Sequence, residues 1–360
     1  MGSRRVLVTG GCGFVGRHLI ARLAREPGIE IWIIDDLSSG LHPSRWERPS
    51  AAALSESSAG ISKFRLTGSD APIFFIQADF MAIALSELGR IASTGIRRLP
   101  EFDEIYHLAS VVGGRNVIDN DPLAVGIDLA VDSAFFLWAA KIAKPGRILY
   151  ASSSAAYPIH RQTQETAEAL QEDMIDFGDV LGKPDYTYGW SKLSGEYLGR
   201  IAVEKYGLKV GVVRPFSGYG EDQEPVYPFP AIALRVAARL NPVTVWGSGL
   251  QSRDFVHIDD AVEACVRTCR IISDGSAVNI GSGMPTTFLG LARRMVEIEG
   301  YDAEVRGRID RPVGVAARYC NPGRMREVLG WSPVISLDDG IRRGLALAKI
   351  RLANGVLPEE

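Results

Sequence analysis

The sequence predicts an α/β fold with a doubly wound parallel sheet and a smaller C-terminal lobe that contributes to substrate binding. Short apolar segments rich in Val and Ile alternate with longer segments of helical periodicity. Strands that are apolar on both faces and separated by helices are typical of a parallel sheet covered on both sides. The expected strands are Arg5–Val8, Glu30–Ile34, Ile73–Gln77, Glu104–His107, Arg147–Tyr150 and Lys209–Val213.

The length of the chain sets the expected domain organisation. A chain of 360 residues, 46% of them hydrophobic, is long enough for one large core and a smaller lobe. Leu41–Asp70, rich in Ser, Ala, Gly and Pro, is expected to be a surface excursion. After Pro215 the alternation weakens; we expect a helix at Ala231–Leu240 and returns to the sheet at Asp254–Ile258 and Ala277–Ile280. The expected main domain comprises residues 1–215 and 253–283, and the expected lobe comprises residues 216–252 and 284–360.

Charge and cysteine content exclude several classes of partner. The net charge of -3, from 40 basic and 43 acidic residues, provides no global field for nucleic acid or an anionic membrane. No signal-peptide pattern precedes the first strand, and charges interrupt the apolar stretches before the 18 residues of a membrane span. The four cysteines form no CxxC pair and the five histidines show no metal-ligand spacing. We therefore expect a cytoplasmic protein with reduced thiols and no metal.

A glycine-rich turn follows the first expected strand directly. Gly10, Gly13 and Gly16 lie just before and within the helical pattern Phe14–Leu23. Such glycines allow a tight turn, the close approach of a pyrophosphate to backbone N–H groups, and close helix–strand packing. Alone, the turn could be purely structural, but its position between a strand and a helix indicates the dinucleotide site of a Rossmann domain.

Acidic residues at the end of the second strand indicate which dinucleotide binds. Asp35 and Asp36 lie close to the offset of about 20 residues at which a carboxylate binds the adenosine ribose. A carboxylate there repels a 2′-phosphate, so the sequence predicts NAD rather than NADP. His107, which also ends a strand, is expected to be a hydrogen-bonded, non-catalytic histidine. Further cofactor contacts are expected at Phe14, Val15, Asp79, Phe80, Leu108, Ala109, Ser110 and Pro215.

A tyrosine and a lysine form the expected catalytic pair. Tyr188 and Lys192 lie four residues apart and therefore share one helical face. An ammonium beside a phenol stabilises the phenolate, which makes Tyr188 a candidate general base, and Lys192 can also hold the nicotinamide ribose. The pattern often arises by chance on a solvated helix. Here it follows the glycine-rich turn, the acidic strand end and the serines of Ser152–Ser154, in that order, which favours catalysis.

In these motifs the chain resembles the extended short-chain dehydrogenases that act as nucleotide-sugar epimerases and dehydratases, from Gly10 to about Trp331. The resemblance implies that Ser153 is the catalytic serine, acting with Tyr188 and Lys192. Trp246–His257 is similar to the family segment in which an arginine binds the diphosphate, which implies that role for Arg253. The other substrate contacts that the resemblance implies are Gly113, Gly114, Ser153, Ser217, Gln251 and Arg318.

The resemblance also implies a homodimer. In this family two helices of each subunit form a four-helix bundle with those of its partner. The corresponding helices here carry the patterns Ile127/Val131/Phe135/Trp138 and Trp190/Leu193/Tyr197/Ile201. Simple core packing of the monomer explains the same patterns.

Departures from the family pattern narrow the expected chemistry. The similarity to GDP-mannose 3,5-epimerases is greatest in three stretches, Gly113–Gly114, Tyr150–Pro158 and Arg311–Val315. This similarity favours GDP as the nucleotide of the substrate. However, Ala155 stands where those enzymes have a catalytic cysteine, and Ser154 and Ala155 stand where 4,6-dehydratases have two acids. The sequence therefore predicts an NAD-dependent nucleotide-sugar epimerase that transiently oxidises C4. The alternatives are a 4-dehydrogenase, a 3,5-epimerase, a 4,6-dehydratase, and an NAD-binding sensor or scaffold.

Overall fold

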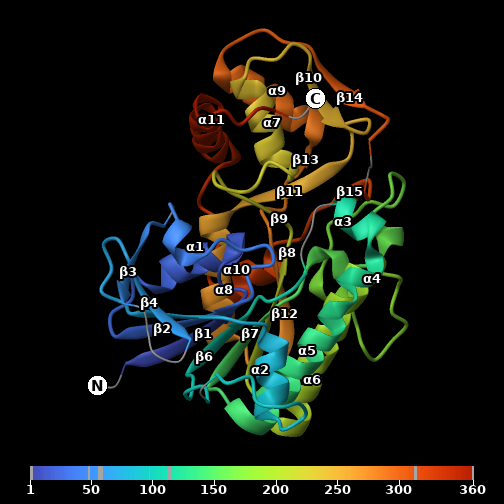
Figure 1. Cartoon of the computed structure of the whole chain (residues 1–360). Coiled ribbons are helices and arrows are strands. Elements are labelled where there is room, and N and C mark those ends of the chain that lie inside the picture. Colours follow the sequence, from blue (N-terminus) through green and yellow to red (C-terminus); the bar gives the residue numbers. More distant parts are fainter. Residues whose placement is uncertain are drawn as a thin grey trace.

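A nine-stranded sheet forms the centre of the larger lobe (Figure 1). The computed structural model describes residues 3–47, 49–55, 60–96, 98–111, 115–311 and 314–358. The strands of the sheet within these residues are β1 (Arg4–Thr9), β2 (Ile29–Asp35), β3 (Ala51–Ser55), β4 (Ile61–Leu66), β5 (Ile73–Gln77), β6 (Glu104–His107), β7 (Arg147–Ala151), β8 (Val210–Pro215) and β12 (Asp274–Ile280). Their spatial order is β12-β8-β7-β6-β1-β2-β5-β4-β3, and every neighbouring pair is parallel except β5–β4 and β4–β3. The predicted doubly wound sheet and all six expected strands are confirmed.

The prediction for Leu41–Asp70 was wrong in one respect. This segment contains β3 and β4, which form an antiparallel hairpin that extends the sheet at its edge. In β4, Phe64 and Leu66 are buried while Lys63 and Arg65 are exposed. That period-two alternation is the pattern of a strand with one buried face. It is short, and the surrounding small and polar residues conceal it.

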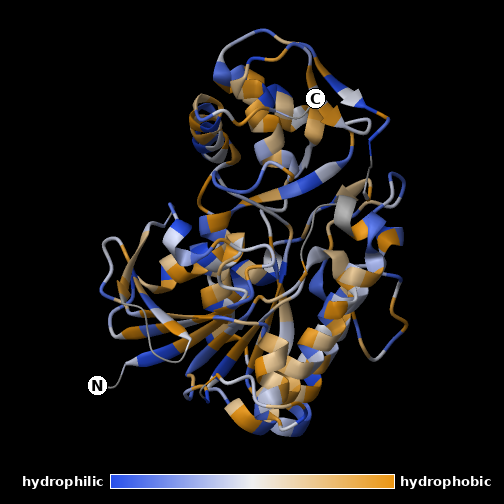
Figure 2. Cartoon of the chain, in the orientation of Figure 1, coloured by the Kyte–Doolittle hydropathy of each residue, from blue (hydrophilic) through white to orange (hydrophobic). Residues whose placement is uncertain are grey.

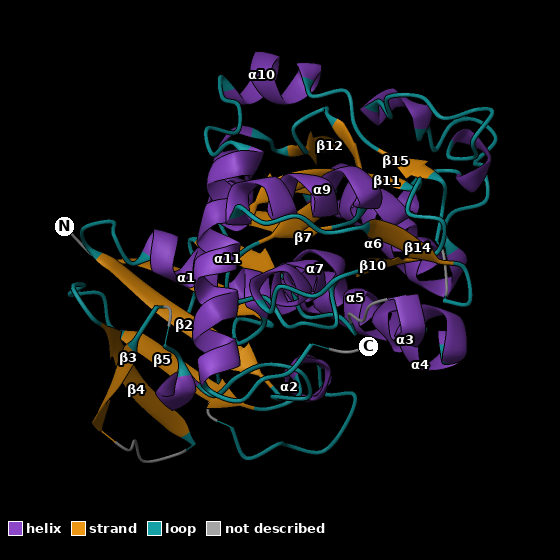
Figure 3. Ribbon diagram, turned by 90° about the horizontal axis from the view of Figure 1, so that it is seen from above, coloured by secondary structure: helices purple, strands orange, loops and turns teal. Residues whose placement is uncertain are grey.

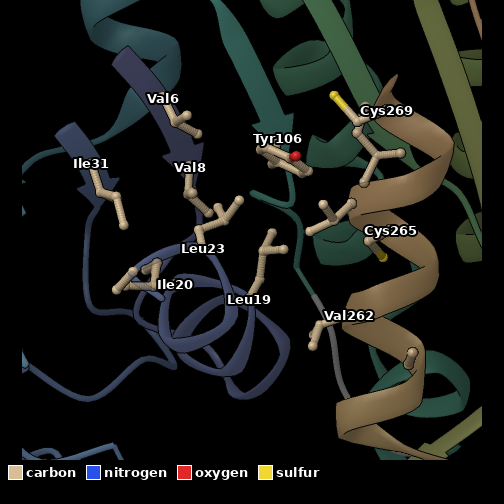
Figure 4. Close-up of a cluster of buried hydrophobic side chains, with 14 of the residues drawn as sticks. Val6, Val8, Leu19, Ile20, Leu23, Ile31, Tyr106, Val262, Cys265 and Cys269 are labelled. Atoms are coloured by element: carbon tan, nitrogen blue, oxygen red, sulfur yellow. The ribbon is translucent and has the colours of Figure 1, made fainter. Parts of the chain in front are cut away.

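Helices cover both faces of the sheet. One face is covered by α1 (Phe14–Leu23), α8 (Ile258–Ile271) and α10 (Gly323–Leu329), and the other by α2 (Phe80–Glu87), α5 (Ile127–Trp138) and α6 (Tyr186–Tyr206). Successive side chains of a strand point to opposite faces, so Val6 and Val8 pack with the first layer and Leu7 with the second. Figure 4 shows Val6 and Val8 on their strand, above Leu19 and Leu23 of α1, with α8 to the right. The apolar runs of the strands thus account for two cores, one on each side.

Short elements complete the larger lobe. They are α3 (Arg115–Asn120) and α4 (Pro122–Val125), a π-helical turn at Ala139–Ala143, and 3-10 turns at Pro43–Arg45, Ser154–Ala156, Ile159–Arg161 and Glu172–Met174.

The smaller lobe has its own core and lies at the carboxyl edge of the main sheet (Figures 1 and 3). Its core contains Phe229, Phe255, Leu291 and Ile341. Its elements are α7 (Pro228–Ala237), α9 (Phe288–Glu299), α11 (Leu337–Ala353), the paired strands β10 (Val243–Trp246) and β14 (Val305–Arg308), and a sheet of β9 (Ser217–Tyr219), β11 (Ser252–His257), β13 (Pro285–Thr287) and β15 (Ala317–Arg318).

Two predictions for this half of the chain need correction. The helix expected at Ala231–Leu240 is α7, which starts and ends three residues earlier. The strand expected at Asp254–Ile258 exists as β11, but it pairs with β9, β13 and β15 rather than with the main sheet. A local pattern indicates a strand but does not name its partners, and Phe255 packs into the core of the smaller lobe. By contrast, the strand expected at Ala277–Ile280 is β12, which does join the main sheet.

The predicted domain boundaries at residues 215, 253 and 283 stay a prediction. The segment 284–360, assigned to the smaller lobe, includes α10. Met325 and Leu329 of α10 are buried in the core that α1 and α8 form with the main sheet.

One helical run among the described residues, Pro122–Ala143, is long and apolar enough by length and composition to span a membrane. It does not stand out in the sequence because Asp128 and Asp132 interrupt it. In the structure α5 packs on the main sheet, with Phe135 and Trp138 buried against it. Asp128 and Asp132 are buried and hydrogen-bonded, so we interpret the run as a helix of the fold.

Gly195 of α6 allows the helix to approach β7. A Cβ atom at this position would collide with the hydroxyl of Tyr150 and would lie 2.6 Å from Oδ2 of Asp132. At Gly199, one turn further along the same helix, the nearest atom to an added Cβ is 3.4 Å away. The first glycine is therefore required by packing, and the second is not.

We predict that Gly195→Ala destabilises the protein by about 2 kcal/mol or more, because inserting a methyl group into a packed core displaces its neighbours. Gly199→Ala is the matched control and should be neutral or stabilise by up to about 1 kcal/mol, since Ala is the better helix former. Urea unfolding of both variants measures the difference. Equal stability of the two variants would contradict the packing argument.

Candidate active site

Several of the predicted cofactor residues lie at the carboxyl edge of the main sheet. The chain leaves β1 for β2 on one side, and later places β6 on the other side of β1. Ligands of doubly wound sheets bind at such a switch point, beyond the carboxyl ends of the two strands. The loop after β1 contains Gly10, and the loop after β6 contains Leu108, Ala109 and Ser110.

The glycine-rich loop has the backbone geometry that a dinucleotide requires. Gly10 has φ +68°, and an added Cβ would lie 2.7 Å from the backbone nitrogen of Ala109. At Gly16 an added Cβ would lie 2.6 Å from the carbonyl oxygen of Gly10. Gly13 directly precedes α1, whose first backbone N–H groups have no intrahelical acceptor. A close loop at a helix N-terminus is typical of a pyrophosphate site, and the contact of these glycines with the cofactor stays a prediction.

Asp35 also shapes that loop, which the sequence argument missed. Its carboxylate accepts hydrogen bonds from the backbone nitrogens of Cys12 (2.8 Å) and Leu37 (2.8 Å). Burial raises the pKa of Asp35, against the effect of these two hydrogen bonds. Each carboxylate oxygen has two lone pairs, so Asp35 can still accept from a ribose hydroxyl. Asp36 is exposed and accepts from the nitrogen of Ser38.

Other predicted cofactor residues have different surroundings. Asp79 caps α2 through the backbone nitrogen of Met81 (2.8 Å), and Phe80 is buried in the core beside His107. The hydroxyl of Ser110 donates to Asp128 (2.6 Å). Phe14 and Val15 begin α1, and Pro215 ends β8. Gly113 and Gly114 lie outside the described residues.

Tyr188 and Lys192 share one face of α6, as the spacing predicts. The ammonium nitrogen of Lys192 lies 5.8 Å from the ring centre of Tyr188 and 5.6 Å from that of Tyr150. Lys192 is only 4% exposed. Burial alone would lower the pKa of Lys192, but the negative charges of Tyr188, Asp132 and Asp128 together raise it. The lysine is therefore a buried cation beside the phenol.

His107 is hydrogen-bonded through both ring nitrogens, as expected. Nδ1 lies 2.7 Å from Oγ1 of Thr9, and Nε2 lies 3.2 Å from Oδ1 of Asp132. Burial lowers the pKa of His107. Its ring stacks on Phe135 with centres 3.8 Å apart, and the hydroxyl of Tyr150 donates to Oδ2 of Asp132 (2.6 Å). The histidine is part of the core below the site.

The three serines after β7 have different environments. Ser152 is buried and its hydroxyl donates to Glu196. Ser154 is also buried, whereas Ser153 is half-buried. The hydroxyl oxygen of Ser153 accepts from the nitrogen of Ala155 (3.1 Å), so its hydrogen can donate to a substrate oxygen. The serine that the family resemblance selects is the most accessible of the three.

A buried ion pair holds the end of β7 against α6, the helix that contains Tyr188 and Lys192. Arg214 of β8 donates to the carboxylate of Glu196 on α6 from Nε (2.9 Å) and Nη2 (2.7 Å). Arg214 also donates to the hydroxyl of Tyr157 (2.9 Å) and to the carbonyl oxygen of Glu172 (3.0 Å). Because Glu196 also binds Ser152, the ion pair joins β7, β8 and α6. No pattern in the sequence singled out Glu196 or Arg214.

Ala155 brings the Ser153 turn against the start of α6. Its carbonyl oxygen accepts from the backbone nitrogen of Asp185 (3.0 Å), and a Cβ added to Gly189 would collide with the same oxygen. The methyl group of Ala155 is buried. The position at which the similar 3,5-epimerases have a cysteine thus holds no acid or base.

The two predicted phosphate-binding arginines are neighbours. Arg253 of β11 and Arg318 of β15 are register partners in a parallel pair. Arg253 donates to the carbonyl oxygens of Ser252 (2.7 Å) and Val315 (2.9 Å). Arg318 donates to Gln162 (2.6 Å) and forms an ion pair with Asp185 (2.9 Å), directly before α6. A local positive site therefore exists in a chain of small net charge.

The remaining predicted substrate residues lie near this sheet. Ser217 begins β9 and is the register partner of Phe255. The side chain of Gln251 is buried and donates to the carbonyl oxygen of Trp246 (2.6 Å), which closes the turn between β10 and β11.

Tyr227, which the sequence argument did not single out, also lies near the catalytic pair. Burial raises the pKa of Tyr227, and the charges of Tyr188 and Glu224 raise it further. The aromatic crowding of Phe216–Pro230 was visible in the sequence, but it did not indicate which of these rings interacts with Tyr188.

The comparisons with known proteins agree with this geometry. A family model described as "NAD dependent epimerase/dehydratase family" matches residues 6–281. The chain is 27% identical over 343 residues to a UDP-glucose 4-epimerase from Mycolicibacterium smegmatis, covering 94% of this chain and 96% of the relative. It is also 27% identical over 262 residues to GDP-mannose 3,5-epimerase 1 from Oryza sativa subsp. indica, covering 70% and 66%.

Solved structures show the same fold. UDP-glucuronic acid 4-epimerase from Bacillus cereus, in complex with UDP-glucuronic acid and NAD, superposes with a TM-score of 0.72 at 22% identity, covering 96% of this chain and 99% of that one. A dTDP-glucose 4,6-dehydratase double mutant from Streptomyces venezuelae, with NAD bound, gives a TM-score of 0.76 at 21% identity, covering 95% and 96%.

Proposed function

The chain belongs to the NAD-dependent epimerase/dehydratase family, and on that premise we propose that it inverts C4 of a nucleotide-diphosphate sugar. It is an NAD-dependent enzyme, and NAD is its cofactor. The observation that carries the proposal is the pairing of Tyr188 with the buried ammonium of Lys192 while position 155 holds a buried methyl group. The residues for oxidation at C4 are thus present, without the familiar acid and base for C3, C5 or C6.

The proposed chemistry follows from the side chains. When bound, NAD supplies a hydride acceptor and donor. The ammonium of Lys192 stabilises the phenolate form of Tyr188, and the phenolate oxygen takes the proton of the sugar 4-hydroxyl, which leaves a neutral phenol. The hydroxyl of Ser153 orients the same oxygen. Tyr188 returns its proton after the 4-keto sugar has turned over, which gives the C4 epimer without any further acid or base.

Arg253 and Arg318 support a diphosphate as the anchor of the substrate. The two residues are register partners on adjacent strands, and a guanidinium group matches the charge and geometry of phosphate oxygens. The relatives named above include enzymes for UDP-sugars and for GDP-mannose. We propose GDP as the nucleotide, because Tyr150–Pro158 and Arg311–Val315 are most similar to GDP-mannose 3,5-epimerases.

We expect the NAD-loaded protein to convert at least one sugar from a panel of GDP-, UDP-, dTDP- and CDP-sugars into a product of unchanged mass that is inverted at C4. Mass spectrometry, NMR and absorbance at 340 nm follow the reaction. Inversion at C3 or C5, loss of water, or net NADH with a keto product would each replace the proposal with the corresponding rival. No reaction across the panel would favour a sensor or scaffold.

We predict that Tyr188→Phe lowers kcat by about 10²–10⁴-fold, since general acid–base catalysis contributes that much. Tyr186→Phe is the matched control, because this exposed tyrosine lies two residues earlier in the same helix. The control should retain its rate, and both variants should retain bound NAD. Comparable losses in the two variants would show that damage to α6, rather than the phenol, is responsible.

We propose that a second copy of the chain packs on α5 and α6. Phe135, Trp138 and Leu193 of the amphipathic patterns are buried inside the monomer. Other apolar residues of the two helices are solvent-exposed: Ile127 by 43%, Leu137 by 37%, Trp190 by 44% and Tyr197 by 49%. Hydrophobic colours run along the α5 layer in Figure 2. An exposed apolar stripe along two adjacent helices is typical of an interface.

Light scattering should give the mass of two chains for the natural protein and of one chain for Leu137→Glu. Ile271→Glu, on the opposite helical layer, is the control with similar exposure and should remain a dimer. A monomeric natural protein at micromolar concentration would refute the dimer.

The proposed location is the cytoplasm. Cys12, Cys265, Cys269 and Cys320 are all buried free thiols, which suits a reducing compartment. Recovery of the protein in an extracytoplasmic fraction of its source cells would overturn this.

A further inference from the structure

The loop that follows β9 is tied to several distant elements by three consecutive residues. Oε2 of Glu221 lies 3.3 Å from Nε2 of His257, and His257 is the residue directly before α8. The carbonyl oxygen of Gln223 accepts from Arg351 of α11 (2.8 Å). Between them, Asp222 binds α1, the helix of the glycine-rich loop. The segment thus joins the smaller lobe to the cofactor side of the larger one.

Asp222 makes the most extensive of these contacts. Its Oδ2 accepts from Nε (3.0 Å) and Nη2 (2.9 Å) of Arg17, and its Oδ1 lies 2.8 Å from Nε2 of His18. Nη2 of Arg17 also donates to the backbone carbonyl of Asp222 (3.1 Å). The three side chains are largely buried. Shielded, charge-assisted hydrogen bonds are stronger than surface ion pairs.

The ion pair between Asp222 and Arg17 keeps both of its charges at neutral pH. Burial alone would raise the pKa of Asp222, but the hydrogen bond with His18 and the positive charges of His18 and Arg17 lower it to about 2. The carboxylate therefore stays ionised, and the guanidinium of Arg17 is always charged.

The loop of residues 220–227 extends from the dinucleotide loop to the catalytic tyrosine. At one end a Cβ added to Gly220 would lie 2.9 Å from Cζ of Phe14, the first residue of α1. At the other end Tyr227 lies close enough to Tyr188 for the charge of Tyr188 to affect its pKa. If NAD binds the glycine-rich loop and reacts beside Tyr188, as proposed above, this loop begins and ends next to residues of the NAD site. Arg17 and His18, which hold the loop, lie within one turn of Phe14.

We infer that Asp222 is a positioning residue that retains bound NAD by fastening the loop of residues 220–227 to α1. The inference rests on the proposed function, because an enzyme that returns the hydride to the same sugar must keep its NAD through the cycle. A dehydrogenase must instead exchange NADH for NAD after every turnover. A strongly fastened loop suits the first behaviour.

The test is the rate at which NAD leaves the intact, NAD-loaded protein. Radiolabelled NAD is bound, an excess of unlabelled NAD is added, and the retained label is measured over time without any sugar. Asp222→Asn keeps the shape of the side chain but removes its charge, and should release NAD about tenfold faster or more. His18→Asn removes the other half of the contact and should accelerate release in the same direction. Asp222→Glu keeps the charge and should remain closer to the natural protein than Asp222→Asn.

Asp338→Asn is the matched control, because Asp338 pairs with Arg294 in the smaller lobe, away from α1 (2.8 Å to Nε). Its NAD release should be unchanged. The inference would be overturned if Asp222→Asn and His18→Asn both released NAD at the rate of the natural protein. It would also be overturned if Asp338→Asn released NAD as fast as Asp222→Asn does. No sugar is present in this experiment, so the NAD release rates can be interpreted even if no sugar of the panel is epimerised.

Discussion

The buried ion pair between Glu196 and Arg214 is the constraint on which the active site depends. Both side chains are 3% exposed, and the guanidinium cannot lose its proton. Breaking such a pair leaves an uncompensated buried charge, at a cost of about 3–5 kcal/mol. Glu196 lies one helical turn after Lys192 and also binds Ser152, next to Ser153. One carboxylate therefore sets the position of the helix that carries the phenol relative to the strand that carries the serine.

A second set of buried charges sets the electrostatics of the same helix. Asp128 and Asp132 lie on α5 beneath Lys192, and both are hydrogen-bonded to neighbours other than the lysine. Burial lowers the pKa of Lys192, but the negative charges of these two aspartates and of Tyr188 raise it by more. In a low dielectric, a fixed ammonium acts strongly on a nearby phenol. The polar residues that interrupt the apolar run of α5 thus affect the charge of Lys192, the residue proposed to act with Tyr188, as well as the packing of the fold.

The strands and the catalytic spacing were predictable because their signals are local. Apolar runs marked six strands, α1 was predicted with its observed bounds, and Tyr188 and Lys192 were found from their spacing. The hairpin of β3 and β4 was missed because its alternation is short. The partners of β11 were wrong because a strand pattern carries no information about pairing. Glu196–Arg214 and Arg17–Asp222 join residues 18 and 205 positions apart, and such pairs leave no periodic trace in a sequence.

The ion pair of Arg318 with Asp185 has a consequence for the site without its substrate. Arg253 and Arg318 are register partners on adjacent strands, and like charges on neighbouring strands repel each other. Asp185 acts as a resident counterion that keeps Arg318 in place. If the two arginines bind the diphosphate as proposed, Arg318 is held for that role by a charge of the protein itself rather than by an ion from solution.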